Sequence, residues 1–182
     1  MNKLMMKLVV GTEAMFFLSL IVAFIYFSLS PAFRNLQQST LDIKTTGMFS
    51  VLLFSSSFTF WRADANCRKG RINRLKFWLL FTIILGIIFL VGQAKEYMKL
   101  LDEHVNLASS TFGTSFFTLT GFHGLHVVVG LIILTIVTCL AFLGDFDAGG
   151  SSVISTVGIY WHFVDIVWVF VFFVVYVVPH LM

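Results

Sequence analysis

The chain has 182 residues, of which 58% are hydrophobic and 12% are charged. Such a composition excludes an ordinary water-soluble domain and predicts a protein with several membrane-spanning helices. The net charge of +3 gives no indication of nucleic-acid binding, because in a membrane protein the position of each basic residue matters more than the sum. The two cysteines predict neither a disulfide nor a metal site, since one falls in a basic loop and the other in an apolar segment.

Five apolar segments follow one another along the chain. About 20 apolar residues, at 1.5 Å each, cross the hydrocarbon core of a bilayer. The second segment is the weakest, because it is short and rich in serine and threonine, whereas the fourth exceeds one crossing and should tilt or project beyond the hydrocarbon. We therefore predict a single all-α domain covering residues 1–182, a bundle of five transmembrane helices. The predicted spans are about residues 8–30, 45–61, 75–94, 110–143 and 153–178.

The basic residues predict the orientation of these spans. Six of them lie in the loop 62–76, which should therefore be cytoplasmic, and Lys3 and Lys7 precede the first span on the same side. Of the 12 basic residues, these eight lie inside and the other four outside. With five spans, the N-terminus is then cytoplasmic and the C-terminus lies outside.

The first span carries a glutamate. The N-terminal residues resemble the start of a signal peptide, but the apolar stretch that follows is too long and lacks a small-residue cleavage site, so we expect a retained span. Glu13 lies roughly 9 Å from the cytoplasmic start of this span. A carboxyl group at this depth indicates either a packing residue that hydrogen-bonds a neighbouring helix or a carboxylate at a subunit interface near the proton-uptake side.

The third span ends in a cluster of polar residues. Gln93, Glu96 and Tyr97 stand at its outer end, with Lys95 among them. Tyrosine and charged residues at a helix end are typical of the membrane interface, so these side chains indicate an interfacial belt.

The fourth span holds two histidines at mid-depth. His123 and His126 share one face of the helix, and Gly121 and Gly124 would let a neighbouring helix approach closely. Two histidines could ligate a haem or a metal. Hydrogen bonds from these histidines to a carboxylate of the fifth span are the preferred interpretation, because they satisfy two costly groups at once.

The last span holds polar residues in the middle of an apolar run. Asp165 lies roughly 20 Å from Ser152 along the helix, close to half depth. His162 shares the face of Asp165, and Trp161 and Trp168 follow the same helical spacing. An ionisable residue at this depth costs several kcal/mol unless it faces protein and finds a partner. We therefore predict that this face packs inward against the other helices.

Residues 160–168, Tyr-Trp-His-Phe-Val-Asp-Ile-Val-Trp, resemble the last-helix signature of subunit III of haem-copper terminal oxidases. Residues 111–117 and 120–127 resemble the penultimate-helix signature of that family. Residues 92–97 resemble its Gln-x-x-Glu-Tyr stretch, and residues 11–17 resemble the helix that bears its intramembrane glutamate. The resemblance covers nearly the whole chain. Many members have seven spans, and this chain is similar to the short five-helix prokaryotic form, which begins at the helix equivalent to the third.

The resemblance implies a chain without a redox centre or any other cofactor of its own. Subunit III of this family binds subunit I, which holds the haems and copper and reduces O2 with proton pumping. It stabilises that core and supports proton uptake and O2 access. The implied partners are subunits I and II, further oxidase or supercomplex subunits and membrane lipids in a prokaryotic cytoplasmic (inner) membrane, with no nucleic acid. Bound phospholipid is compatible with the resemblance, although the family's lipid-filled cleft adjoins the two helices that this chain lacks.

The resemblance also implies roles for individual residues, none of them catalytic and none a metal ligand. Glu13 is expected to be the intramembrane carboxylate at the proton-uptake side, near subunit I. The other expected roles are internal polar links between helices (His123, His126, His162, Asp165), an outer-side structural patch (Gln93, Glu96, Tyr97) and helix packing (Gly121, Gly124, Trp161, Trp168).

The expected electron donor is cytochrome c. The alternatives are a quinol oxidase of the same superfamily and, further away, a membrane haem-binding electron-transfer protein or a small transporter.

Overall fold

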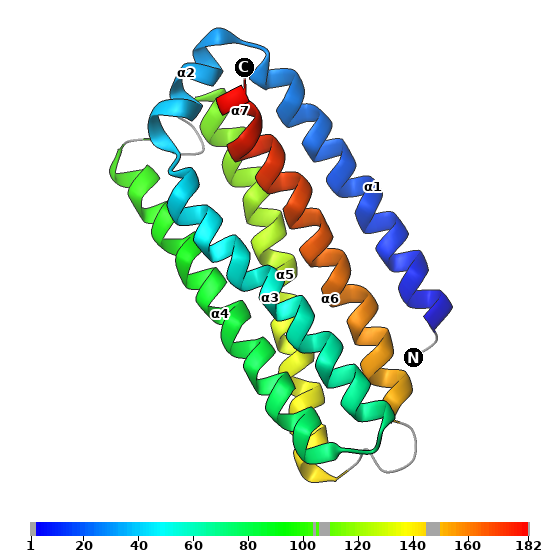
Figure 1. The fold of residues 1–182 in the computed structure, drawn as a ribbon. Coiled ribbons are helices and arrows are strands. Elements are labelled where there is room, and N and C mark those ends of the chain that lie inside the picture. Colours follow the sequence, from blue (N-terminus) through cyan, green and yellow to red (C-terminus); the bar gives the residue numbers. More distant parts are fainter. Residues whose placement is uncertain (1–2, 104, 106–109, 145–149, 182) are drawn as a thin grey trace.

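The computed structural model describes residues 3–103, 105, 110–144 and 150–181, and within these ranges every regular element is a helix (Figure 1). The elements are α1 (Lys3–Ser28), α2 (Pro31–Thr40), α3 (Ile43–Arg68), α4 (Ile72–Asp102), α5 (Thr111–Leu143), α6 (Gly150–Phe172), the π-helical segment η1 (Phe173–Val177) and α7 (Val178–Leu181). The long helices α1, α3, α4, α5 and α6 run in alternating directions along the bundle. The start of α1 lies at the end that holds the α3–α4 turn, and α7 lies at the opposite end, beside α2. The predicted all-α class is confirmed.

Local capping residues set several of the helix ends. Asp42 precedes α3, and its Oδ1 accepts the backbone N–H groups two and three residues later at 3.0 and 3.4 Å. Ser110 precedes α5, and its Oγ accepts the N–H three residues later at 3.0 Å. These contacts satisfy donors that have no partner inside the helix. Gly70 has φ +65°, a conformation that side chains with a Cβ rarely adopt, and it lets residues 69–71 turn α3 into α4.

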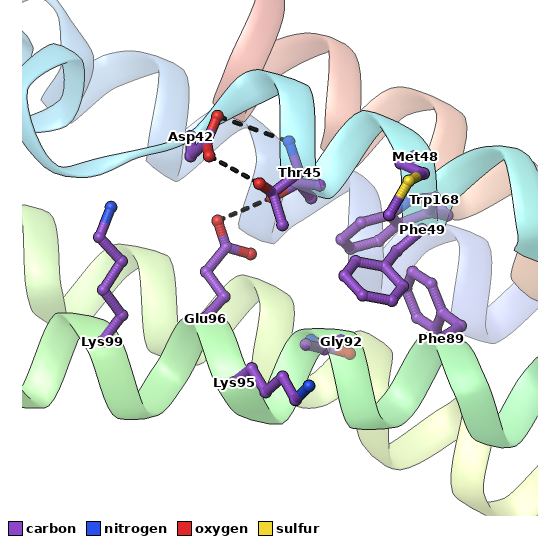
Figure 2. Close-up of a pocket in the computed structure, with 12 residues that line it drawn as sticks. Asp42, Thr45, Met48, Phe49, Phe89, Gly92, Lys95, Glu96, Lys99 and Trp168 are labelled. Carbon is purple, nitrogen blue, oxygen red and sulfur yellow. Dashed lines mark hydrogen bonds between the residues drawn. The ribbon is translucent and has the colours of Figure 1, made fainter.

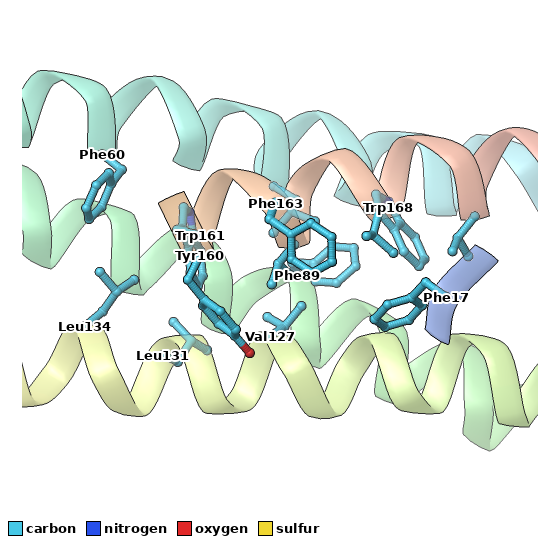
Figure 3. Close-up of a cluster of buried hydrophobic side chains, with 14 of the residues drawn as sticks. Phe17, Phe60, Phe89, Val127, Leu131, Leu134, Tyr160, Trp161, Phe163 and Trp168 are labelled. Carbon is cyan, nitrogen blue, oxygen red and sulfur yellow. The ribbon is translucent and has the colours of Figure 1, made fainter. Parts of the chain in front are cut away.

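Helix α6 lies in the interior of the bundle and α1 lies at its edge. Helix α6 packs against α1, α3 and α5, whereas α1 packs against α5 and α6, and α4 packs against α3 and α5. Over its most apolar stretch, 56% of the α6 positions are buried, against 11% for α1. The buried cluster around α6 contains Trp161 and Trp168, with Phe60 of α3, Phe89 of α4 and Leu134 of α5 (Figure 3).

Four helical stretches are long and apolar enough to cross a membrane within the described part of the chain. They are α1, α4, α5 and the stretch Ser152–Val177, which covers most of α6 and all of η1. Helix α3 contains the predicted second span and has 26 residues, but its serines and threonines lower its hydropathy. The five-span count and the orientation of the termini therefore stay predictions.

The helices extend beyond the apolar segments that predict them. Helix α3 continues to Arg68 and α4 begins at Ile72, so most of the basic stretch 62–76 is helical rather than a loop. The reason is that hydropathy marks the apolar part of a helix, while polar turns can continue it into the headgroup region.

Helix α2 is also absent from the sequence prediction, because it is short and amphipathic. It buries Phe33 and Gln37.

Candidate functional site

Helix α3 provides hydrogen-bond partners for the two buried tryptophans of α6. Trp161 Nε1 donates to Ser56 Oγ at 3.1 Å, and Trp168 Nε1 donates to Ser50 Oγ at 2.8 Å. Both indoles are fully buried, and a buried donor without a partner costs about 1–3 kcal/mol. These contacts explain why a helix with so many hydroxyl groups packs inside the bundle.

One further hydroxyl of α3 joins the two polar residues at mid-length of α6. Ser57 Oγ donates to Asp165 Oδ2 and lies 2.9 Å from His162 Nδ1. Because a hydroxyl has a single proton, the imidazole must donate from Nδ1, which leaves Nε2 as the acceptor of the neutral ring. Asp165 is buried, and its Oδ1 has no hydrogen-bond partner among the described residues. The polar face of α6 thus lies against α3.

A second polar pair joins α1 to α5. Glu13 Oε2 lies 3.1 Å from His126 Nε2, and His126 Nδ1 donates to the carbonyl oxygen of Phe122 at 2.7 Å. A carbonyl oxygen only accepts, so Nδ1 carries a proton, and a hydrogen bond between Nε2 and the carboxyl group requires a further proton on one of those two groups. Tyr160 of α6 donates its hydroxyl to the backbone oxygen of His126 at 3.1 Å. The pair can therefore hold a proton at a position supported by three helices.

The predicted hydrogen bond between a histidine of α5 and the carboxylate of α6 is wrong. His126 contacts Glu13 of α1 instead, and Asp165 contacts Ser57 of α3. His123 has no hydrogen-bond partner for either ring nitrogen in the described ranges, and its ring stacks on that of Trp168 at a centroid distance of 4.7 Å. The reason is rotational: the spacing of these residues gives their depth, but the neighbour that each one meets depends on how the helices are turned.

Gln93 and Tyr97 join the C-terminal part of α4 to α5. Gln93 Nε2 donates to the carbonyl oxygen of Thr120 at 2.8 Å and to the Tyr97 hydroxyl at 3.2 Å. The hydroxyl groups of Tyr97 and Thr120 lie 2.7 Å apart. The three residues form a closed set of contacts between two helices, rather than a belt that only faces the membrane interface.

Glu96 and Gln37 form hydrogen bonds with the π-helical segment η1, which follows α6. Glu96 accepts hydrogen bonds from the hydroxyl of Thr46 at 2.9 Å and from that of Tyr176 at 2.8 Å. Gln37 of α2 donates to the carbonyl oxygen of Val175 at 2.7 Å. Val175 and Tyr176 both lie in η1, where the i→i+5 pattern re-aims carbonyl groups and side chains. Helices α2 and α4 thus both hydrogen-bond the same π-helical turn, and α3 is joined to it through Glu96.

The sequence matches the cytochrome c oxidase subunit III family over residues 2–179. The chain belongs to this family. Cytochrome c oxidase subunit 3 of Synechocystis sp. is 37% identical over 166 residues, which cover 90% of this chain and 70% of the relative. The probable subunit 3 of Mycobacterium leprae is 31% identical over 166 residues, or 91% and 82% of the two chains. That of Nocardia farcinica is 34% identical over 142 residues, or 78% and 70%.

The stretches that resemble subunit III signatures lie on α1, α4, α5 and α6, and the serines of α3 fall outside all of them. Ser50, Ser56 and Ser57 are among the residues that the sequence prediction misses. A signal was present, because hydroxyl residues recur at helical spacing through the second predicted span and such side chains hydrogen-bond across membrane helices. Helix α3 therefore provides the hydrogen-bond acceptors for tryptophans that lie in the family signature on α6.

Two glycines that the sequence does not single out make close contacts with a neighbouring helix. A Cβ added to Gly130 would lie 2.8 Å from the Trp161 ring, and one added to Gly86 would lie 3.2 Å from it. At the predicted packing positions the space is larger for Gly121, with the nearest atom at 3.7 Å, and intermediate for Gly124, at 3.1 Å. The two glycines beside Trp161 are therefore the ones that admit a large side chain between α4 and α5.

The part of the chain that the structure describes contains no group of three or more His, Cys, Asp or Glu side chains placed to hold a metal ion. His126 already uses both ring nitrogens, and the ring of His123 packs against aromatic side chains. Chemically, the paired polar side chains can join helices through hydrogen bonds and, at Glu13 and His126, hold a proton.

Proposed function

We propose that the chain is subunit III of a proton-translocating haem-copper terminal oxidase in an aerobic respiratory chain, with cytochrome c as the electron donor. In this proposal the chain holds no redox centre. It stabilises the O2-reducing core of subunit I and supports proton uptake and O2 access, while subunit II and further subunits complete the complex in a prokaryotic cytoplasmic membrane. The family match over residues 2–179 carries the proposal.

Hydrogen bonds between polar side chains of different helices support the proposed role in stabilising the core of subunit I. Asp165 and His162 share one hydroxyl of α3, and Glu96 holds hydroxyl groups of α3 and η1. Such contacts join helices that are far apart in the sequence. Hydrogen bonds of this kind hold the helices in fixed positions, so the bundle can offer a rigid surface to a larger partner in the membrane.

We assign Glu13 to the proton-uptake side, at the contact with subunit I. It lies on α1, the least enclosed of the four apolar helices, and its side chain is 33% exposed. A shallow pocket of about 370 Å³ between α1 and α5 reaches both Glu13 and His126. A carboxyl group that is open on one side and paired with an imidazole on the other can take up a proton and release it without a rearrangement of the helices.

The proposed topology has five spans, with α3 as the second. The basic residues at the α3–α4 turn and those in the first two turns of α1 lie at the same end of the bundle (Figure 1), as a common cytoplasmic side requires. The hydroxyl groups of α3 that face α6 are paired, which lowers the cost of placing this less apolar helix in the membrane.

The donor is proposed from the relatives' names, which are those of cytochrome c oxidases. A quinol oxidase of the same superfamily is the alternative, because the donor binds to other subunits. A haem-binding electron-transfer protein has less support. One of its candidate ligands, His126, is engaged with Glu13, and the other, His123, packs between aromatic rings.

The experiment that tests the proposal is a mild-detergent purification of the tagged chain from its native membrane, with a reduced-minus-oxidised spectrum and an O2-consumption assay of the eluate. We expect a large multi-span partner, haem absorbance and turnover with reduced cytochrome c. If quinol supported turnover and reduced cytochrome c did not, the quinol-oxidase alternative would replace the proposal that cytochrome c is the donor. Haem that stays on the isolated chain would favour electron transfer, and a colourless chain without such a partner would overturn the proposal.

A further inference from the structure

A pocket of about 300 Å³ opens between α3 and α4, at the end of the bundle where α2 lies (Figure 2). Its floor is Trp168 of α6. Helix α1 packs on the other side of the bundle, against α5 and α6. The pocket is thus separate from the Glu13–His126 pair and from the face that we assign to subunit I.

The inner half of the pocket is apolar. Phe49 and Met48 of α3 face Phe89 of α4 across it, with the Trp168 ring behind them (Figure 2). Gly92 lets the Phe49 ring lie directly against the backbone of α4, because a Cβ at that position would lie 2.4 Å from the ring. A larger residue would push the ring into the space. The shape of this apolar half therefore depends on the position that the Phe49 ring takes against Gly92.

The rim of the pocket carries both signs of charge. Lys95 and Lys99 line it from α4 and are exposed, and Asp42 lines it from the start of α3. Among the described residues, Lys95 has no ion pair, and Lys99 has only a long contact to Glu103 at 3.8 Å. The hydroxyl of Thr45 and a backbone N–H hydrogen-bond the carboxylate of Asp42 and lower its pKa, so it is ionised at neutral pH.

We propose that this pocket binds a zwitterionic phospholipid with an amine headgroup, such as phosphatidylethanolamine. The phosphate would meet Lys95 and Lys99, the ammonium would meet Asp42, and one acyl chain would enter over Phe49 and Phe89. The dimensions agree: the rise along α4 from Lys99 to Phe89 is roughly 15 Å, which spans the headgroup region of one leaflet and the first part of the hydrocarbon. A pocket of about 300 Å³ holds that part of a lipid, and the rest lies along the outer face of the bundle.

The test is native mass spectrometry of the full chain, purified in mild detergent with any subunits that accompany it, stripped of lipid and then titrated. The probes are phosphatidylethanolamine and phosphatidylglycerol with the same acyl chains. We expect the first to bind several-fold more tightly. Lys99→Gln should weaken its binding about fivefold, since one cation near the membrane surface contributes about that factor. The matched control is Lys69→Gln, an exposed lysine at the other end of α3, which should change nothing.

Two more variants separate the headgroup from the acyl chain. Asp42→Ser keeps a good helix-capping residue but removes the charge, so it should abolish the preference for the amine lipid. Gly92→Ala should reduce binding of both lipids by displacing Phe49 into the apolar half of the pocket. Circular dichroism verifies that each variant is folded; if Gly92→Ala is not, a shorter acyl chain, which should bind more weakly, replaces it.

Several outcomes would overturn the inference. Equal losses in Lys99→Gln and Lys69→Gln would show a general charge effect. Equal binding of the two lipids would exclude the role of Asp42. Displacement of the lipid by inorganic phosphate or by glycerophosphoethanolamine, which has no acyl chains, would show a site for a headgroup or free phosphate alone. The binding assay needs no oxidase activity, so a failure here is distinguishable from a failure of the proposed function.

Discussion

The substitution Gly130→Ala should destabilise the bundle, whereas Gly121→Ala in the same helix should not. A Cβ on Gly130 would lie 2.8 and 2.9 Å from two ring atoms of Trp161, well inside the usual carbon contact of about 3.5–4.0 Å. At Gly121 the nearest atom, the Tyr97 hydroxyl, lies 3.7 Å away. The two changes are therefore the same in chemistry and different only in what the new methyl group meets.

Two opposing terms set the size of the effect. Alanine in place of glycine within a helix gains about 0.8–1 kcal/mol, while an extra methyl group in a packed core costs about 1–3 kcal/mol. Trp161 cannot withdraw easily, because it is 1% exposed and its Nε1 is bonded to Ser56. The cost should then lie in the upper part of that range. We expect Gly130→Ala to lose about 1–2 kcal/mol of unfolding free energy, and Gly121→Ala to lose none and to gain at most about 1 kcal/mol.

Titration of the purified chain in maltoside micelles with sodium dodecyl sulfate, followed by circular dichroism, measures the unfolding free energy. The substitution Trp161→Phe removes part of the ring that the new Cβ meets. Gly130→Ala should therefore cost less in that background, with a coupling of at least about 0.5 kcal/mol. Equal destabilisation by the two glycine variants, or strict additivity of the double variant, would refute this account of the packing.

Three further substitutions test the polar contacts. Ser57→Ala removes the described partner of Asp165 and should cost about 1–3 kcal/mol in the same titration, while Ser55→Ala, an exposed hydroxyl bonded only within α3, should cost less than about 0.5 kcal/mol; equal costs would contradict the assignment. Glu13→Gln should leave the assembled complex intact but shorten sustained turnover or slow proton uptake, measured with a pH dye in vesicles, and unchanged values would exclude the role. The Thr45 hydroxyl and a backbone N–H lower the pKa of Asp42 from 3.8, so its contribution to stability is complete above that value and is lost as the pH falls through the lower folded-state pKa. Asp42→Asn should accordingly flatten the decline in stability below about pH 5, and an unchanged acid-unfolding curve would refute this.

Hydropathy and helical spacing were sufficient for part of the structure. The all-α class follows from long apolar runs with few prolines. The depth of Asp165 along its helix follows from a rise of 1.5 Å per residue, and its burial follows from the cost of an ionisable group that faces lipid. Each of these properties depends on one helix alone, so it can be predicted from the sequence without knowing how the helices pack together.

The pairings could not be predicted, because they depend on the rotation of one helix against another. His126 and Asp165 lie at similar depth, which made a bond between them reasonable. The rotation of α6 is set by Trp161, which lies against Gly86 and Gly130, and this turns Asp165 toward α3. The span within α3 ranked as the weakest in the sequence prediction for a related reason. Hydropathy counts each serine as unfavourable in the membrane, whether or not a residue far away in the sequence hydrogen-bonds it.

The hydrogen bonds between α3 and α6 also bear on the order in which the chain is made. Ser56 and Ser50 accept from tryptophans that follow them by 105 and 118 residues, so α3 is synthesised well before its partners exist. During that interval Ser50 can still donate to the carbonyl oxygen of Thr46 in its own helix, a bond of 2.8 Å in the finished fold. Nascent chains that stop before α6 should therefore insert but not mature. We expect membrane proteases to clear them faster than the full-length chain in a pulse-chase experiment, and equal lifetimes would show that α3 is complete without α6.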